Sequence, residues 1–292
     1  MKNFILYLLF QFFYFLVLLL PDKLRYYLGK LFGKFAYYIT PERREIVYNN
    51  MKKSFKDKYS EEKLKKMTKE VYYNTGLILV EFILLKKLNK DNLKDFIEIK
   101  GEENLKKAYE KNNGVIIYGA HFGNWELMGS AISLLGYPLN AIAREQANSY
   151  FNRKINKIRR NKGVKIIPKG ISVRKVYEAF KKGECVFILG DQDAKNKGWK
   201  MNFFDRPSST FSGAVQMASR TGAIIVPTFL VRKGWRKYEL TFYPPKEVSE
   251  DAQKEVKKQI LQNLVDLTEE IIREYPTQWF WLHRRWKTYK GD

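Results

Sequence analysis

The 292-residue sequence contains very few of the side chains that bind metals or form disulfides. Cysteine occurs once, at Cys185, and histidine twice, at His121 and His283. A single cysteine excludes an intrachain disulfide framework and a cysteine-based zinc site, and two histidines exclude most histidine-rich metal chemistry. We therefore expect neither a metal nor another cofactor.

Acidic side chains are also scarce, since 31 Asp and Glu stand against 54 Lys and Arg, which leaves a formal net charge of +23. Hydrophobic residues nevertheless make up 45% of the chain, which excludes a disordered polyelectrolyte because enough surface can be buried. A charge of this size implies a polyanionic partner, which could be nucleic acid, an anionic membrane or an acidic protein.

Long hydrophobic runs are absent apart from one at the N-terminus, which excludes a polytopic membrane protein. Residues 4–20 have Gln11 as their only polar member and would form about 25 Å of helix, close to the roughly 30 Å hydrocarbon core. A signal peptide is less favoured, because Pro21 and Asp22 stand where small cleavage-site residues are needed. We therefore expect residues 1–21 to form a retained single-pass membrane anchor.

Basic residues follow this run closely, at Lys23, Arg25, Lys30 and Lys34. By the positive-inside rule they place the rest of the chain on the cytoplasmic side. The same cations would lie against anionic headgroups, each contributing about 1 kcal/mol. An anionic membrane surface is thus the expected partner, and nucleic acid is not expected.

Beyond the anchor, the pattern predicts a basic helical lead-in over residues 22–100 and an α/β core over residues 101–292. In the core, short β-like runs alternate with helical patterns, which is typical of a largely parallel, twisted sheet flanked by helices. A last long helix is expected before Pro276, followed by a basic and aromatic tail. The expected strands lie at residues 114–118, 140–143, 164–167, 185–189, 223–231 and 238–243.

The main chemical signal follows the first of these strands, where residues 114–129 read GVIIYGAHFGNWELMG. This places His121 at the carboxyl edge of the sheet, where open α/β folds keep their sites. Asn124 is expected to cap the helix that begins near Trp125. Glu126, in its first turn, could fold back onto the imidazole and orient it as a general base. The alternative is a capped helix beside a histidine without chemistry.

Two further polar groups lie at strand ends. Asp191 and Asp193 follow a strand and could bind a divalent ion or belong to an ordinary turn. Ser209 and Thr210 precede a helix and could bind a phosphate through their hydroxyls or simply cap that helix.

Four stretches of the chain resemble a known protein family. AHFGNWE, at residues 120–126, is similar to the H-x4-D/E box of the glycerolipid and lysophospholipid acyltransferase superfamily. The whole chain resembles one branch, the lipid A biosynthesis acyltransferases that add the late, secondary acyl chains. The supporting stretches are LGDQDAKNKGWKMNFFDRPSSTFSG at residues 189–213, ASRTGAIIVPTFLVR at residues 218–232 and PTQWFWLHRRWK at residues 276–287.

The resemblance implies a membrane-anchored O-acyltransferase at the cytoplasmic face of the bacterial inner membrane. It would transfer a fatty acyl chain from a thioester to a hydroxyl of a lipid A precursor, with acyl carrier protein as donor, although some relatives use acyl-coenzyme A. His121 would be the general base, oriented by Glu126, and Asp191 would support the site without a metal. Asn124, Ser209 and Thr210 are further candidates for substrate contact.

The resemblance also implies an arginine that holds a substrate phosphate. Arg159 is the first candidate for this role and Arg160 the second. Both lie in residues 144–182, where 13 basic and two acidic residues leave a local charge of +11.

Two other functions remain open. The acceptor could be a phospholipid or a phosphatidylinositol mannoside, because related acyltransferases share these sequence boxes. In a different class, the protein could be a non-enzymatic basic tether for anionic lipid or nucleic acid, which would account for the charge but not for the residues around His121.

Overall fold

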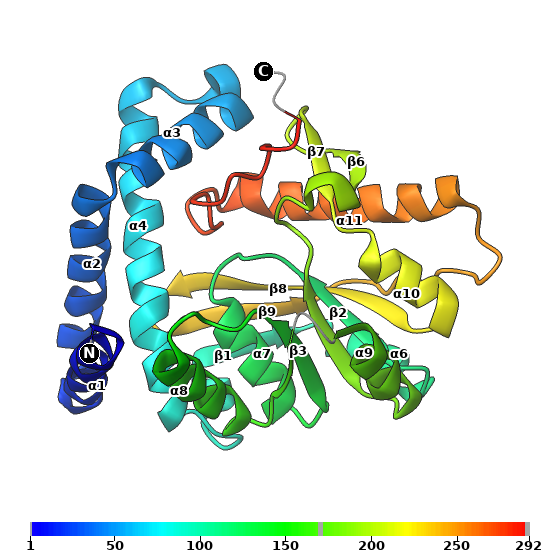
Figure 1. The fold of residues 1–292 in the computed structure, drawn as a ribbon, viewed down its shortest axis with the longest axis horizontal. Helices are drawn as coiled ribbons and strands as arrows, with labels where there is room; N and C mark the ends of the chain where they lie inside the picture. Colours follow the sequence, from blue (N-terminus) through cyan, green and yellow to red (C-terminus); the bar gives the residue numbers. More distant parts are fainter. Residues whose placement is uncertain (1, 169–171, 290–292) are drawn as a thin grey trace.

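The computed structural model describes residues 2–168 and 172–289, and a seven-stranded sheet lies at its centre (Figure 1). The strand order is β1-β9-β8-β2-β5-β3-β4, and every neighbouring pair is parallel except β8 and β9. The predicted α/β class with a mostly parallel sheet is confirmed. The strands are β1 (Ile97–Lys100), β2 (Val115–Gly119), β3 (Leu139–Ala143), β4 (Lys165–Pro168), β5 (Cys185–Leu189), β8 (Ile224–Gly234) and β9 (Lys237–Phe242).

Helices cover both faces of the sheet, because successive side chains of a buried strand point to opposite sides. In β2, Val115 and Ile117 belong to the core under one group of helices, and Ile116 and Tyr118 to the core under the other. The first group is α6 (Glu102–Glu110), α7 (Trp125–Leu134) and α8 (Ser149–Arg160). The second group is α9 (Ser172–Lys181), α10 (Gly213–Thr221) and α11 (Lys254–Glu274).

Shorter elements connect these layers. An antiparallel hairpin of β6 (Trp199–Asn202) and β7 (Pro207–Thr210) lies beside α11. Short helical segments are α5 (Leu93–Phe96) and the 3-10 turns at Lys56–Lys58, Leu85–Lys87 and Lys195–Lys197.

Four helices precede the sheet and form a layer at one side of it (Figure 1). They are α1 (Lys2–Leu19), α2 (Asp22–Ile39), α3 (Pro41–Phe55) and α4 (Glu61–Leu84). A Cβ atom at Gly33 would overlap the backbone of Tyr72, and one at Gly76 would overlap the backbone of Gly29. These glycines therefore let the backbones of α2 and α4 pack in direct contact.

A buried ion pair joins this helical layer to the sheet. Glu81 of α4 accepts hydrogen bonds from both terminal nitrogens of Arg232 in β8, one of them at 2.8 Å. Asn124 donates to the same carboxylate at 2.9 Å, and Tyr238 accepts from Arg232 at 2.8 Å. Removing one partner of such a pair costs about 3–5 kcal/mol, because it leaves a buried charge unpaired. The pair thus fixes α4 against β8, and the Asn124 contact ties α4 to the start of α7.

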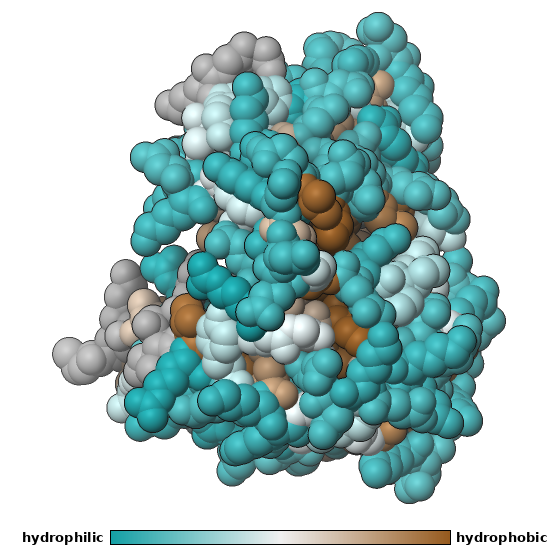
Figure 2. Space-filling model, turned by 90° about the vertical axis from the view of Figure 1, so that its right-hand side faces the viewer, coloured by the Kyte–Doolittle hydropathy of each residue, from teal (hydrophilic) through white to brown (hydrophobic). Residues whose placement is uncertain are grey.

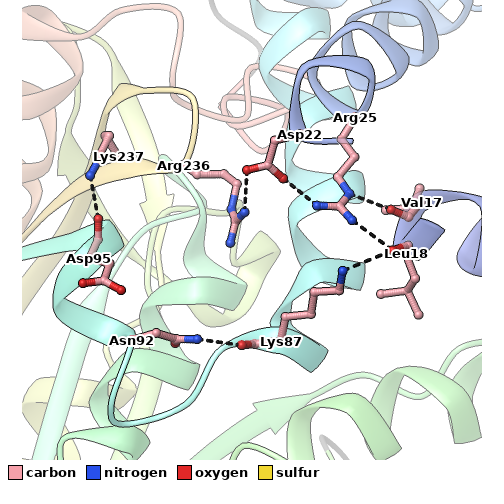
Figure 3. Close-up of polar contacts among 9 residues, drawn as sticks. All are labelled: Val17, Leu18, Asp22, Arg25, Lys87, Asn92, Asp95, Arg236 and Lys237. Carbon is pink, nitrogen blue, oxygen red and sulfur yellow. Dashed lines mark hydrogen bonds and ion pairs between the residues drawn. The ribbon is translucent and has the colours of Figure 1, made fainter. Parts of the chain in front are cut away.

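Figure 3 shows the polar contacts where α1 meets α2. Arg25 donates to the backbone carbonyls of Val17 and Leu18, at 2.8 and 2.9 Å, and so satisfies carbonyl groups at the C-terminal end of α1. Asp22 pairs with Arg25 and, at 2.8 Å, with Arg236 in the turn between β8 and β9. The junction of the two helices is therefore tied to the sheet.

The predicted single-pass anchor at residues 1–21, and with it the predicted single-pass localisation, is wrong. Among residues 2–168 and 172–289, no helix combines the length and the apolar character needed to span a bilayer. At 18 residues α1 is about 27 Å long, short of the roughly 30 Å hydrocarbon core. Part of its apolar surface also covers protein, since Tyr14 and Val17 are buried in the core that lies under α7 and α8.

Candidate active site

His121 lies in a tight turn between β2 and α7, at the carboxyl edge of the sheet where the sequence predicts it. Gly123 allows this turn, because its φ of 55° is left-handed and a Cβ atom there would overlap the carbonyl of Leu230. Asn124 ends the turn as the predicted cap of α7, since its Oδ1 accepts from the Leu127 N–H at 3.0 Å. The imidazole is thus held on a rigid strand–turn–helix unit.

Asp191 is the carboxylate that orients His121. Its Oδ1 lies 2.8 Å from the imidazole Nδ1, and its Oδ2 accepts from the His121 backbone N–H at 3.0 Å. The indole of Trp279 donates to the same Oδ2 at 2.8 Å. Because Nδ1–H faces this buried carboxylate, Nε2 keeps a free electron pair, as a general base requires.

Glu126 does not have the partner that the sequence predicts. Its Oε2 accepts from Arg159 Nε at 2.9 Å and its Oε1 from Arg159 Nη2 at 2.5 Å, so the carboxylate forms a two-pronged ion pair with α8. The predicted contact of Glu126 with the imidazole of His121 is therefore wrong. The carboxylate beside the imidazole is that of Asp191, which the resemblance implies as a support of the site. Asp191 follows β5, which pairs in parallel register with β2, so both strands end at the same edge.

Three residues predicted to contact the substrate are fully buried, and their contact with a substrate remains a prediction. Asn124 bonds to Glu81 and to the start of α7. Thr210 accepts from buried Arg285 at 2.5 Å, and the Ser209 hydroxyl donates to the carbonyl of Lys195 at 2.5 Å. The hydrogen-bonding groups of these side chains thus have partners within the protein.

The C-terminal tail supplies supporting groups whose role the sequence does not reveal. Arg285 is almost fully buried and binds the β7 strand, while Trp279 reaches Asp191. His283 accepts from the Asp193 backbone N–H at 2.9 Å through Nε2, and burial lowers the pKa of its imidazole, which favours the neutral form. The tail therefore braces the loop that carries Asp191.

A cavity of about 680 Å³ opens beside the imidazole, within the size range of ligand pockets. Its polar lining includes His121, Glu126, Arg159 and Gln192, whose amide nitrogen lies 3.4 Å from His121 Nε2. A base next to such a cavity can activate a hydroxyl group beside an apolar chain. The apolar lining consists of Trp125, Ala141, Ile142, Ala143, Val164, Val173, Val176, Phe187, Ile188, Leu189, Phe211, Ala214 and Met217, with Gly129 and Gly213.

The two candidate arginines, Arg159 and Arg160, line different cavities. Arg159 lines the cavity beside His121 and is paired with Glu126. Arg160 lines a second, neighbouring cavity instead. A role for either in binding phosphate remains a prediction.

Because Asp191 is ionised in the folded protein, we expect the stability of the fold to depend on pH. Burial opposes the charge, but the nearby His121, with hydrogen bonds from His121 and Trp279, holds the pKa of this carboxyl at about 2. This pKa lies below the ordinary value of about 3.9, so the ionised Asp191 stabilises the fold above about pH 4. About 2 kcal/mol of the free energy of unfolding is lost as the pH falls from about 4 to about 2.

Urea unfolding at several pH values tests this for Asp191→Asn, which should lack this part of the acid-induced loss. The matched control is Asp193→Asn, whose carboxylate accepts from Thr288 and which should retain it. Equal loss in the wild type and in Asp191→Asn would contradict the assignment.

Known proteins resemble this chain over most of its length. The family model described as bacterial lipid A biosynthesis acyltransferase matches residues 1–288. The lipid A biosynthesis palmitoleoyltransferase of Escherichia coli (strain K12) is 28% identical over 278 residues, covering 92% of this chain and 87% of that protein. The lipid A biosynthesis lauroyltransferase of the same organism is 28% identical over 278 residues, covering 94% and 88%.

A phosphatidylinositol mannoside acyltransferase of Mycobacterium tuberculosis (strain ATCC 25618 / H37Rv) is 25% identical over 194 residues, covering 64% of this chain and 59% of that protein. The family match extends over almost the entire chain. The chain therefore belongs to the bacterial lipid A biosynthesis acyltransferases.

Proposed function

We propose that the protein transfers a fatty acyl chain from an acyl thioester to a hydroxyl of a lipid A precursor, with His121 as general base. The observation that carries this proposal is the imidazole, held by Asp191 at the edge of an apolar cavity. The family and its lipid A relatives support the acceptor. A non-enzymatic tether would need neither the oriented imidazole nor the cavity.

The geometry supports direct transfer. Nε2 of His121 takes the hydroxyl proton as the acceptor oxygen attacks the thioester carbonyl carbon, and Asp191 stabilises the imidazolium that forms. Gln192, beside Nε2, is placed to donate to the developing oxyanion. When the carbon–sulfur bond breaks, the thiolate leaves with the proton from His121. The apolar lining of the cavity accommodates the acyl chain.

Acyl transfer by the purified protein tests this reaction, with products identified by mass spectrometry. His121→Ala and Asp191→Asn should each lower kcat by about 10²–10⁴, the usual contribution of a positioned base. Asp193→Asn is the matched control and should keep most of the activity. Near wild-type transfer by His121→Ala would rule out the mechanism.

The same assay distinguishes the alternative acceptors. The mycobacterial relative favours a phosphatidylinositol mannoside as second candidate. Acylation of that lipid or of a phospholipid, with no product from a lipid A precursor, would replace the proposed acceptor.

Acyl carrier protein, a small acidic protein, is the proposed donor. The basic segment at residues 144–182 forms α8, β4 and α9, and its Arg144, Arg159 and Tyr177 line the cavity of His121. An acidic carrier would be steered toward this segment, whereas coenzyme A carries fewer charges.

Raising the salt concentration should therefore lower kcat/KM more for the carrier-linked donor than for acyl-coenzyme A with the same chain. Steady-state kinetics at several ionic strengths measures this difference. An equal salt dependence for both donors would remove the case for carrier recognition by this segment.

A peripheral contact with an anionic membrane surface is proposed for α1 and α2. Their outer faces expose large apolar side chains, and Lys23 and Lys34 of α2 lie beside them. By contrast, the opposite face of the molecule is mostly hydrophilic, with small apolar areas between polar side chains (Figure 2). Such an amphipathic pair can lie in the interface plane without spanning the bilayer. The exposed residues are Phe4, Leu6, Leu8, Leu9, Phe12, Phe15, Leu19, Leu24, Tyr27, Leu31, Phe35, Tyr38 and Ile39.

Replacing Phe12 and Leu31 by Gln should weaken binding to anionic liposomes, because it removes apolar area without changing charge. These side chains are 70% and 60% exposed, so the fold should be retained. The control is Val256→Gln, at a 50% exposed position of α11. Co-sedimentation measures binding, and equal binding by all the variants would contradict this orientation.

A further inference from the structure

A second cavity, of about 480 Å³, lies next to the cavity of His121. The two cavities share Ala143 and Arg144, at and just after the end of β3, as lining residues. Unlike the first cavity, the second is lined mainly by polar side chains. Its lining consists of Ala143, Arg144, Glu145, Asn152, Arg153, Asn156, Lys157, Arg160, Asn161, Ile166 and Pro168.

One face of α8 and its C-terminal cap provides most of this lining. The lining positions 152, 156 and 160, and likewise 153, 157 and 161, are spaced four residues apart, so they form two adjacent rows on one side of the helix. Ile158 on the other side is buried in the core, and Phe151 packs against Phe10 of α1. The helix is therefore held by its apolar face while its polar face forms the cavity wall.

The charges in this wall are unbalanced. Arg144, Arg153, Lys157 and Arg160 are four cations, and Glu145 is the lining's acid. Within residues 2–168 and 172–289, none of the four cations has a carboxylate within ion-pair distance. Cations that line the same cavity repel one another, and a bound anion would relieve that repulsion. Arg159, the first candidate for phosphate binding, is by contrast already neutralised by Glu126.

We propose that this second cavity binds a phosphate ester group of a substrate. Arginine guanidinium groups match the oxygens of a phosphate in pairs, and Asn152, Asn156 and Asn161 add amide donors. The inference rests on the proposed function, because a phosphate held here would position the rest of the substrate through the shared wall at Arg144. The phosphate has two chemical sources, a phosphorylated glycolipid acceptor or the phosphopantetheine arm of the donor.

Calorimetric titration with inorganic phosphate at constant ionic strength tests the cavity without any reaction. Arg160→Gln and Arg153→Gln should each weaken phosphate binding about 10- to 100-fold, the effect of losing a charge-assisted contact. Lys154→Gln is the matched control, because it removes one positive charge from the same helix at a position that faces Tyr14. It should bind within about twofold of the wild type. An equal loss in all three variants would overturn the proposal, since a diffuse basic surface would explain it.

Kinetics with matched substrates then identifies the source of the phosphate. If the acceptor supplies it, Arg160→Gln raises KM for the phosphorylated glycolipid and leaves KM for its dephosphorylated form unchanged. If the donor supplies it, the variant raises KM for an acyl-phosphopantetheine and not for the acyl-pantetheine. An unchanged KM for all four substrates would overturn the proposal. Wild-type protein that transfers no acyl chain would refute the proposed function instead, and the phosphate titration would still decide whether the cavity binds an anion.

Discussion

The site depends on the hydrogen bonds that converge on the Asp191 carboxylate. They come from the backbone and the imidazole of His121 and from the indole of Trp279, two residues that lie far apart in the sequence. Asp191 is 7% exposed, and a buried carboxylate is stable only when its oxygens are bonded. The β2–α7 turn, the end of β5 and the C-terminal tail must therefore all be in place before the base is formed.

Much of this arrangement follows from local patterns. The buried run before His121 predicts β2, and Asn124 predicts the start of α7, because both signals act over a few residues. The partner of the imidazole, by contrast, depends on contacts between residues that are distant in the sequence. Glu126 is the nearer acid in sequence, but its direction is set by Arg159, 33 residues away on α8. Sequence spacing contains no information on that contact, so the folded chain is needed to show that Glu126 is not the partner of the imidazole.

In the N-terminal helices, hydrophobicity alone likewise does not predict which contacts a helix makes. The composition of α1 correctly indicates a surface that avoids water, but it does not indicate what covers that surface. Tyr14 and Val17 are buried by protein, whereas Phe12 and Leu19 are 70% and 83% exposed. Which side of the helix faces the core depends on α4, α8 and the Arg25 contacts that hold the end of α1. An apolar run therefore predicted a spanning segment where the fold uses a half-covered helix.

The arrangement of α8 explains why one arginine could not be chosen from the sequence. Neighbouring residues of a helix point about 100° apart, and here Arg159 and Arg160 line different cavities. Arg159 faces α7 and fixes Glu126 beside the base, and Arg160 faces the second cavity with the other cations. The basic segment thus contributes in two ways. One is an internal ion pair that lines the cavity of His121, and the other is a set of cations that have no carboxylate partner among the described residues. Its charge of +11 describes both contributions together, and only helix geometry separates them.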